Sequence, residues 1–269
     1  MSSRLNPIGL FDSGVGGLTV AHAISTLLPR EQLIYYGDTA HLPYGDKSKQ
    51  TIVNYSLEIA DFLLKKGVKV ILIACNSAST NAFEEVKKHV GRKAYVLNVV
   101  DPVVEYAVTS DDSQHIGVIG TKATIHSGTY PDRIRERRSD LTVSSLATPL
   151  LVPMIEEGFV FDDISNAIIR SYLGRQELEG IDGLILGCTH YPIIRNQISR
   201  YYNFEVNVMD TSRIVAAYLQ KFLEEQDLLA GKRGGEDRFY VSDHTPYFDA
   251  IARMFFNKKI DLQVSGKTR

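Results

Sequence analysis

The sequence predicts an α/β protein made of two pseudo-symmetric lobes, each a mainly parallel sheet flanked by helices, with a cleft between them. Two observations predict this class. Short apolar runs alternate with longer helical patterns along nearly the whole chain, which is typical of strand–helix units. In addition, two stretches of the first part reappear in altered form in the second part. A chain of 269 residues is long enough for about two domains.

The predicted strands are short runs rich in Ile, Val, Leu and Tyr, and most are apolar throughout instead of alternating with polar residues. Such runs are typical of strands that are buried on both faces of a parallel sheet. The predicted strands are Pro7–Phe11, Gln32–Tyr36, Val68–Ala74, Tyr95–Asn98, His115–Ile119, Thr142–Leu146, Gly183–Leu186, Glu205–Val208 and Arg238–Val241.

Helical patterns lie between these strands. Thr51–Lys66 and Ser212–Glu225 each carry an apolar stripe with a period of about 3.6 residues. A further helix is expected to end near Val108, before a turn signal, DDSQ, at 111–114. The glycine-containing segment Ala230–Gly235 is predicted to be a surface loop.

The internal repeats concern the ends of the strands. VILIACNSAS at 70–79 matches GLILGCTHYP at 183–192, and IGLFDSGVGG at 8–17 matches IGVIGTKAT at 116–124. Each half therefore brings one cysteine to the carboxyl edge of its sheet, where open α/β sheets bind ligands.

The composition excludes some classes of partner. The net charge is −2 and 23% of the residues are charged, so no general attraction to nucleic acid or to an anionic membrane is expected. The opening residues lack a secretory signal, and apolar runs such as 68–75 are too short to span a bilayer. We expect a soluble cytoplasmic protein with reduced thiols.

The chain has two cysteines, Cys75 and Cys188, in matching contexts. A thiol between a strand and a helix N-terminus favours the thiolate form, which is the reactive one. Two such thiols on opposite sides of a cleft suit the inversion of a stereocentre, because one removes a proton and the other delivers one to the opposite face. This pattern predicts a racemase or epimerase that uses no cofactor.

Other interpretations of the cysteines remain. A cysteine near a strand is often only a small buried apolar residue, and a disulfide between the two is a further alternative. The sequence does not favour a metal site, because there is no C-x2-C pair and His190 lacks partners at ligand spacing. A phosphatase loop is also disfavoured, since the interval from Cys188 to Arg195 is one residue too long.

Polar residues follow the first strand. Asp12 and Ser13 precede Gly14, Gly16 and Gly17, whose N–H groups could approach an anion at a helix start. The pattern G-x-G-G departs from the dinucleotide pattern G-x-G-x-x-G, so nucleotide binding is disfavoured. Asp12 could instead be only a helix cap.

Two further segments allow a structural or a functional interpretation. Tyr44 and Gly45 belong either to a surface turn or to a turn whose N–H groups face a ligand. In PLLVPMIEEGF, Glu156 and Glu157 either occupy an ordinary first helical turn or bring a carboxylate to the cleft.

The residues after each cysteine are also candidates. Asn76 and Ser77, or Thr189 and His190, either cap a helix or hold the carboxylate and ammonium groups of an amino acid. His190 could also tune the thiol of Cys188.

Taken in order, the motifs FDSGVGGLTV, DTAHLPYG, ACNSAS, GVIGTKAT, PLLVPMIEEG and GCTHYP resemble the glutamate racemase family. The resemblance implies racemisation of L- and D-glutamate by two thiols without a cofactor or metal, supplying D-glutamate for peptidoglycan. It further implies that Cys188 removes the α-proton of L-glutamate and that Cys75 removes that of D-glutamate.

The resemblance also assigns the remaining site residues. Assistance in proton transfer falls on Asp12, Glu156 and His190. The implied substrate contacts are Asp12, Ser13, Tyr44, Gly45, Asn76, Ser77, Thr121, Thr189 and His190. The chain departs from the family at Ser77, where Thr is usual, and His190 stands where aspartate racemases carry Glu, which favours glutamate.

By the same resemblance, the second lobe is inserted into the first and the active site lies in the cleft between them. Lobe one, with Cys75, would comprise residues 1–98 and 211–269, and lobe two, with Cys188, residues 99–210. The oligomeric state varies in this family, so a homodimer is one open alternative. The other functional alternatives are a racemase for a different acid, a two-lobed solute-binding protein and an NAD-type dehydrogenase.

Overall fold

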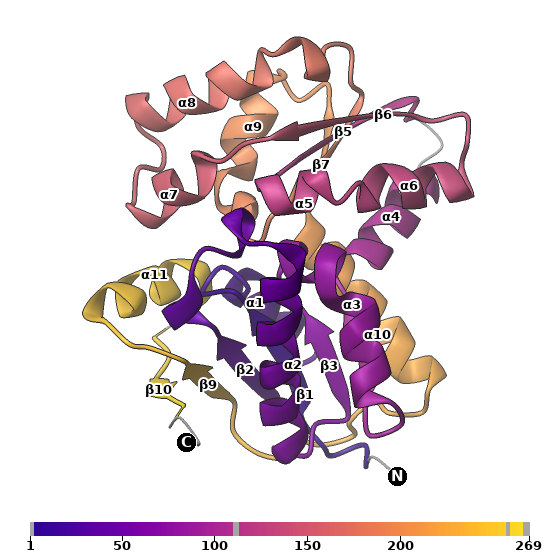
Figure 1. Ribbon diagram of the computed structural model, residues 1–269, viewed down its shortest axis with the longest axis vertical. Coiled ribbons are helices and arrows are strands. Elements are labelled where there is room, and N and C mark those ends of the chain that lie inside the picture. Colours follow the sequence, from indigo (N-terminus) through magenta and orange to yellow (C-terminus); the bar gives the residue numbers. More distant parts are fainter. Residues whose placement is uncertain (1–2, 110–112, 257–258, 266–269) are drawn as a thin grey trace.

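The computed structural model describes residues 3–109, 113–256 and 259–265, and it shows two separate sheets, one in each half of the molecule, both flanked by helices (Figure 1). The strands are β1 Ile8–Asp12, β2 Leu33–Gly37, β3 Val70–Ile73, β4 Tyr95–Asn98, β5 His115–Gly120, β6 Thr142–Ala147, β7 Gly183–Gly187, β8 Asn207–Met209, β9 Arg238–Val241 and β10 Leu262–Val264. The α-helices are α1 Leu18–Leu27, α2 Lys49–Lys65, α3 Asn76–Val90, α4 Val100–Thr109, α5 Lys122–His126, α6 Thr129–Arg137, α7 Leu151–Glu156, α8 Asp163–Leu173, α9 Arg195–Tyr201, α10 Thr211–Glu225 and α11 Pro246–Phe256.

The strands form two parallel sheets. One has six strands in the order β10-β9-β2-β1-β3-β4, and the other has four in the order β6-β5-β7-β8. The order β2-β1-β3-β4 is therefore repeated as β6-β5-β7-β8. In each set the strand that comes first in the sequence, β1 or β5, lies between two others. This repetition confirms the prediction of an α/β fold with two pseudo-symmetric halves.

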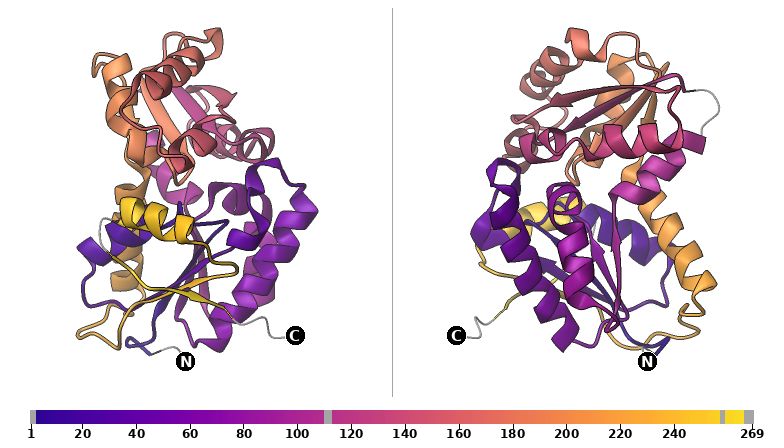
Figure 2. Two further views of the ribbon diagram at one scale, coloured as in Figure 1. Left: turned by 90° about the vertical axis from the view of Figure 1, so that its left-hand side faces the viewer. Right: turned by 45° about the vertical axis from the view of Figure 1, so that its right-hand side comes forward.

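The chain passes between the two sheets twice, from β4 through α4 to β5 and from β8 through α10 to β9. Figure 2 shows α10 running from the four-stranded sheet along the six-stranded one. Helix α1 packs against α10 and α11, so the last part of the chain covers the same side of the six-stranded sheet as α1.

The burial of the strands explains their apolar sequences. Every residue of β1, β3 and β7 is buried, which is expected where helices cover both faces of a parallel sheet. The same burial leaves the carboxyl ends of these strands as the places where polar side chains gather.

Most predicted elements are found, with shifts at their ends. The predicted strand Val68–Ala74 is longer than the observed β3. The predicted strand Glu205–Val208 begins and ends earlier than the observed β8. The short strand β10 was missed, because Leu262–Val264 has only three residues and two of them are exposed. The segment Ala230–Gly235 has no regular structure, but Ala230 is buried, which the surface-loop prediction did not include. Positions 111–112 of the predicted turn lie outside the described residues.

A buried ion pair between Lys69 and Glu31 lies at the end of the six-stranded sheet where its strands begin. The Lys69 ammonium donates to the Glu31 carboxylate at 2.6 Å, to the Arg4 carbonyl at 2.7 Å and to the Leu228 carbonyl at 2.9 Å. The other Glu31 oxygen accepts from the N–H of Ala230 at 2.8 Å. The pair thus joins the start of the chain to the segment that returns after α10.

Within the described residues, no helix has the length and apolar character needed to cross a membrane.

Candidate active site

The two cysteines follow corresponding strands of the two sheets. Cys75 comes after β3 and Cys188 after β7, and both side chains are free thiols and almost fully buried. Cys75 is the N-cap of α3, and its sulfur accepts from the N–H of Ala78 at 3.4 Å. The Cys75 thiol is also 3.7 Å from the Ser13 hydroxyl, which comes from the end of β1.

Cys188 has different surroundings from Cys75. It does not cap an α-helix, because the chain after it forms the short 3-10 helix η4, Tyr191–Ile194, before α9 begins. The prediction of a helix N-terminus beside each thiol is therefore wrong for Cys188. Its sulfur lies 3.6 Å from Nδ1 of His190 instead.

His190 joins Cys188 to Glu156. The Nε2 atom of the buried imidazole is 2.9 Å from a carboxylate oxygen of Glu156. Glu156 is the last residue of α7, so the interpretation that placed it in a first helical turn is wrong. The ring of Phe255 meets the His190 ring edge to face, with centroids 5.1 Å apart.

Asp12 is the last residue of β1 and is followed by the glycine-rich turn. Its fully buried carboxylate accepts from the N–H groups of Gly14 at 3.2 Å and of Gly17 at 3.0 Å. These two N–H groups therefore bind Asp12 and not an external anion. The other carboxylate oxygen is 3.4 Å from the Thr189 hydroxyl, so Asp12 contacts the segment that carries Cys188 and His190.

The turn that contains Tyr44 lies at the surface through Pro43 and Asp46, but it turns Tyr44 inward. It forms the 3-10 helix η2, Tyr44–Asp46, and the Tyr44 side chain is buried with its hydroxyl donating to Asp38 at 2.6 Å. Gly45 lies against Thr121, where an added Cβ would come within 2.8 Å of the Thr121 Cβ.

Polar residues from both sheets meet beside Cys75. The Ser77 hydroxyl is 2.9 Å from the hydroxyl of Thr121, which caps α5. The Asn76 side chain accepts from the hydroxyl of Tyr130 at 2.7 Å. Asn76 and Ser77 belong to the first turn of α3, so they do not cap it.

A cavity of about 40 Å³ lies between the two thiols and brings together most of the predicted residues. It is lined by Ser13, Leu42, Pro43, Tyr44, Gly45, Cys75, Asn76, Ser77, Thr121, Val152, Glu156, Gly187, Cys188, Thr189 and His190. Asp12 is the predicted site residue that does not line it, although Asp12 contacts Thr189 next to it.

Sequence reasoning missed several residues around the cavity. Leu42, Pro43 and Val152 lie inside motifs that were noticed, so their apolar side chains could have been assigned to the lining. No local sequence pattern could assign Tyr130 to the site, because its hydrogen bond to Asn76 joins residues 54 positions apart.

Burial and nearby charges shift the ionisation of the site. Burial, with a smaller effect from the charge of Asp12, raises the pKa of Cys75 to about 12. Burial lowers the pKa of His190, but the hydrogen bonds to Cys188 and Glu156 outweigh this effect and raise it to about 10. His190 is therefore an imidazolium at neutral pH, while Cys75 is a neutral thiol.

No set of three or more His, Cys, Asp or Glu side chains in the described part of the chain is arranged to hold a metal ion.

Gly16 lies so close to His190 that a side chain at position 16 must displace the His190 imidazole. An added Cβ would come within 2.4 Å of the imidazole and 2.7 Å of the Thr189 hydroxyl. We expect Gly16→Ala to lower the catalytic rate about 100-fold by moving the imidazole from its position between Cys188 and Glu156. Gly231→Ala is the matched control, because an added Cβ there would have no neighbour within 4 Å. Equal steady-state rates for the two variants would show that the position of the His190 ring does not affect catalysis.

Comparison with known proteins gives the class first. The family model for Asp/Glu/Hydantoin racemases matches residues 17–219, which is more than half of the chain. The chain therefore belongs to the Asp/Glu/Hydantoin racemase family, and it is an isomerase.

The relatives narrow this class to glutamate racemases. The chain is 41% identical to the glutamate racemase of Persephonella marina over 95% of both proteins. Its fold is similar to the crystal structure of Francisella tularensis glutamate racemase in complex with D-glutamate, with a TM-score of 0.91, 37% identity and 98% of each chain covered. A glutamate racemase isoform from Bacillus anthracis is also similar, with a TM-score of 0.93, 30% identity and 98% of each chain covered. These similarities confirm the resemblance that the sequence motifs indicated.

Proposed function

We propose that this protein interconverts L- and D-glutamate without a cofactor, by proton transfer between the substrate α-carbon and two thiols. The observation that carries the proposal is that Cys75 and Cys188 follow corresponding strands and line the same cavity. Glutamate is proposed as the substrate because relatives that match nearly the whole chain are named glutamate racemases.

In the direction from L-glutamate, the Cys188 thiolate removes the α-proton and becomes a thiol. The electron pair of the broken C–H bond stays on the substrate as a carbanion-like state. The Cys75 thiol then gives its proton to the opposite face of the α-carbon, which forms D-glutamate and leaves a thiolate on Cys75. The reverse reaction exchanges the two roles.

The resting site is prepared for L-glutamate. The imidazolium of His190 lies 3.6 Å from the Cys188 sulfur, whereas burial keeps the proton on Cys75 at neutral pH. We therefore propose Cys188 as the base and Cys75 as the acid in the direction from L-glutamate. Glu156 supports this state, since its carboxylate pairs with the other nitrogen of His190.

Mostly neutral donors, together with the His190 imidazolium, hold the substrate in this proposal. The cavity lining has no Lys or Arg among the described residues, so the glutamate carboxylates would bind hydroxyl, amide and backbone N–H groups. Ser13, Asn76, Ser77, Thr121 and Thr189 all line the cavity and supply such groups. Tyr44 and Gly45 close the cavity between them, with Asp12 holding the Thr189 side chain.

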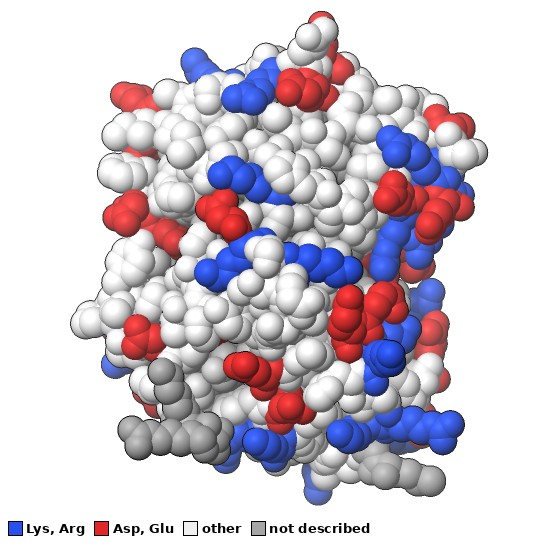
Figure 3. Space-filling view, viewed as in Figure 1, with Lys and Arg blue, Asp and Glu red and all other residues white. Residues whose placement is uncertain are grey.

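The neighbouring surface is basic, which suits an anionic substrate. A second cavity, of about 520 Å³, shares Gly45 with the first and is lined by Lys47, Lys49 and Lys122 together with Asp46, which pairs with Lys122 at 3.1 Å. Figure 3 shows Lys and Arg side chains gathered across the middle of this view of the molecule. Positive charge beside a cavity raises the local concentration of an anionic substrate.

Substrate entry requires the site to open. A cavity of about 40 Å³ has room for roughly three water molecules, which is less than glutamate needs. We infer that two lobes, residues 1–98 with 211–269 and residues 99–210, separate to admit substrate and close around it. Closure excludes water and strengthens the interactions that stabilise the carbanion-like state.

The product suggests the physiological role. We propose that the enzyme acts in the cytoplasm and supplies D-glutamate for peptidoglycan synthesis.

The test of this function is the optical rotation of L-glutamate with purified protein and no added cofactor. We expect the rotation to decay to zero, because the two enantiomers have equal free energies, and we expect a much slower change with L-aspartate. Binding of L-glutamate without any loss of rotation would instead indicate a solute-binding protein. Faster racemisation of aspartate would reject glutamate as the preferred substrate.

The pH dependence of stability tests the charge on His190. Its pKa is about 10 in the folded protein and about 6.5 when unperturbed, so the folded state holds an extra proton between these values. The stability from this proton is fully present below about pH 6.5 and is lost as the pH rises through about 10. Denaturant unfolding of the wild type and His190→Asn should therefore give a difference that shrinks from pH 6.5 to 10. A difference that stays constant over this range would show that His190 is neutral.

A further inference from the structure

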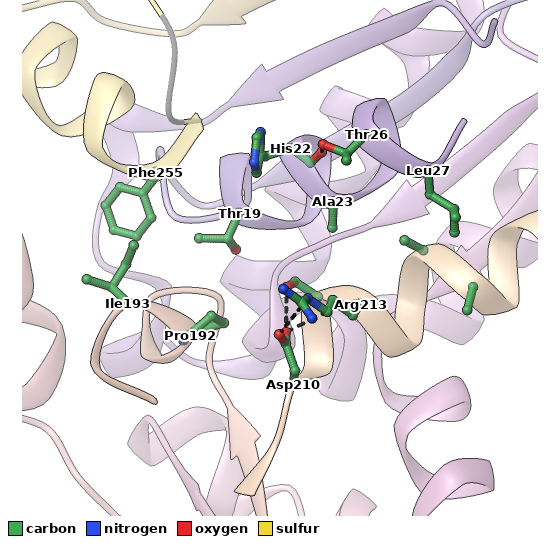
Figure 4. A pocket seen from close by; sticks show the side chains of 13 residues that line it. Thr19, His22, Ala23, Thr26, Leu27, Pro192, Ile193, Asp210, Arg213 and Phe255 are labelled. Atoms are coloured by element: carbon green, nitrogen blue, oxygen red, sulfur yellow. Dashed lines mark hydrogen bonds and ion pairs between the residues drawn. The ribbon is translucent and has the colours of Figure 1, made fainter. Parts of the chain in front are cut away.

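A hydroxyl group from α1 reaches the segment that carries Cys188 and His190. Thr19 lies in the first turn of α1 and is 7% exposed, and its Oγ1 is 2.9 Å from the carbonyl oxygen of Thr189. Figure 4 shows the Thr19 side chain facing the chain at Pro192 and Ile193. The contact joins residues 170 positions apart, from elements next to the two different sheets.

The Thr189 carbonyl needs a donor from outside its own turn. In a 3-10 turn a carbonyl accepts from the N–H three residues later, but here that residue is Pro192, which has no N–H. The neighbouring N–H groups serve other carbonyls, since Tyr191 donates to Cys188 and Ile193 donates to His190, both at 3.2 Å. Thr19 thus supplies the hydrogen bond that proline removes from this buried turn.

The Thr19 hydroxyl has two acceptors within reach but only one proton. The second acceptor is the carbonyl oxygen of Gly16, at 3.0 Å. That oxygen already accepts from the N–H of Thr19 at 3.1 Å, whereas the Thr189 carbonyl has no donor in its own turn. The proton is therefore best placed toward Thr189.

Two more contacts, one from the end of β1 and one from the turn before α1, act on the same segment. The Thr189 hydroxyl is 3.4 Å from Asp12, and Gly16 lies directly against the imidazole of His190. The hydrogen bond from Thr19 to the Thr189 carbonyl acts on this segment as well. The position of the segment determines the distances from His190 to Cys188 and to Glu156.

We propose that Thr19 is a positioning residue of the racemase, whose hydrogen bond to Thr189 holds the His190 ring between Cys188 and Glu156. The expected effect of Thr19 on the racemisation rate rests on the proposed function. Its expected effect on the position of His190 does not. The other ionisable groups near this ring and thiol lie on four elements and across the cavity. They are Glu156 on α7, Asp12 on β1, Tyr130 on α6, Tyr191 in η4 and Cys75 after β3.

The kinetic test compares variants that keep or remove the hydroxyl. Thr19→Val keeps the shape but has no donor, and the adjoining cavity of about 600 Å³ leaves room for the change. We expect Thr19→Val to lower kcat for L-glutamate about 10- to 100-fold with little change in KM, and Thr19→Ser to restore it. The control is Thr26→Val on the same helix, since the Thr26 hydroxyl is exposed and bonds only locally to the His22 carbonyl.

A second test does not depend on racemisation. In a Cys75→Ser background Cys188 is the single thiol, so the pH dependence of its alkylation by iodoacetamide reports its thiolate fraction. We expect Thr19→Val to raise the midpoint of the alkylation curve by about one pH unit, which corresponds to about tenfold slower alkylation at pH values below both midpoints. Thr19→Ser should restore the parent curve and Thr26→Val should leave it unchanged. If Thr19→Val does not fold, Thr19→Ala carries the same expectation.

The outcomes separate the two claims. An unchanged alkylation curve in folded Thr19→Val or Thr19→Ala would overturn the positioning role, whatever the enzyme's activity. A shifted curve in a protein whose wild type does not racemise glutamate would support the positioning role and reject the proposed function.

Discussion

Replacing either cysteine by serine should abolish racemisation of glutamate, with a loss of at least about 100- to 10,000-fold, the usual contribution of a positioned acid or base. A serine hydroxyl keeps its proton at neutral pH, so Cys188→Ser removes the proposed base for L-glutamate and Cys75→Ser removes the proposed base for D-glutamate. Each variant keeps one thiol, because the chain has only two cysteines. The rates would be measured by polarimetry from each enantiomer.

The two variants should differ in what they retain. Cys75→Ser keeps Cys188 and should still exchange the α-proton of L-glutamate with solvent. Cys188→Ser keeps Cys75, so any exchange that it catalyses should be of the α-proton of D-glutamate. Both should bind glutamate with affinity close to that of the wild type, since a sulfur-to-oxygen change leaves the other donors in place. Racemisation near the wild-type rate in either variant would rule out the two-thiol mechanism.

The largest expected effect on stability is at Lys69. Its side chain and that of Glu31 are 0% and 2% exposed, and each proton of the ammonium group has an acceptor. Lys69→Met leaves the Glu31 carboxylate buried without a cation, which typically costs about 3–5 kcal/mol. At about 2–4 °C per kcal/mol for a chain of this size, Tm should fall by roughly 6–20 °C.

A double-mutant cycle makes this prediction specific. Lys69→Met with Glu31→Gln should be more stable than Lys69→Met alone, because the unpaired charge is then absent. Lys221→Met is the control, since Lys221 and Glu225 are 68% and 57% exposed and such pairs contribute at most about 1 kcal/mol. Similar Tm values for Lys69→Met and Lys221→Met would show that the buried pair does not fasten the sheet.

The repeated strand order explains why two similar thiols meet, and their surroundings explain why they differ. Cys75 lies at the start of α3 beside Ser13, in a site that favours the neutral thiol. Cys188 lies beside His190, whose charge is supported by Glu156. The fold is thus nearly symmetric at the level of its strands but asymmetric in its acid–base groups.

The sequence predicted the parts of this arrangement that depend on local patterns. Apolar runs located the strands, and the matched segments around Cys75 and Cys188 indicated that both thiols leave equivalent strands. Local patterns could not show that Gly14 and Gly17 bind the Asp12 carboxylate, because the same glycines would equally suit an external anion. They also could not reveal Thr19, whose partner Thr189 is 170 positions away.

Two errors have a similar cause. Glu156 ends α7 because the helix stops after only six residues, which its apolar sequence does not indicate. Cys188 lacks a helix N-terminus because Pro192 and its neighbours form a 3-10 turn before α9 begins. In both cases the end of a short element, which propensity defines poorly, determines the position of a site residue.

The most direct measurement of the central claim is the isotopic content of the first product formed from L-glutamate in D2O. Separation of the enantiomers at low conversion, followed by mass spectrometry, gives the α-deuterium in each. We expect newly formed D-glutamate to carry a solvent-derived deuteron while the remaining L-glutamate stays protiated, because the proton removed by Cys188 is not the one that Cys75 delivers. D-glutamate that retains the original α-proton would show that a single group acts on both faces, and would contradict the two-thiol mechanism.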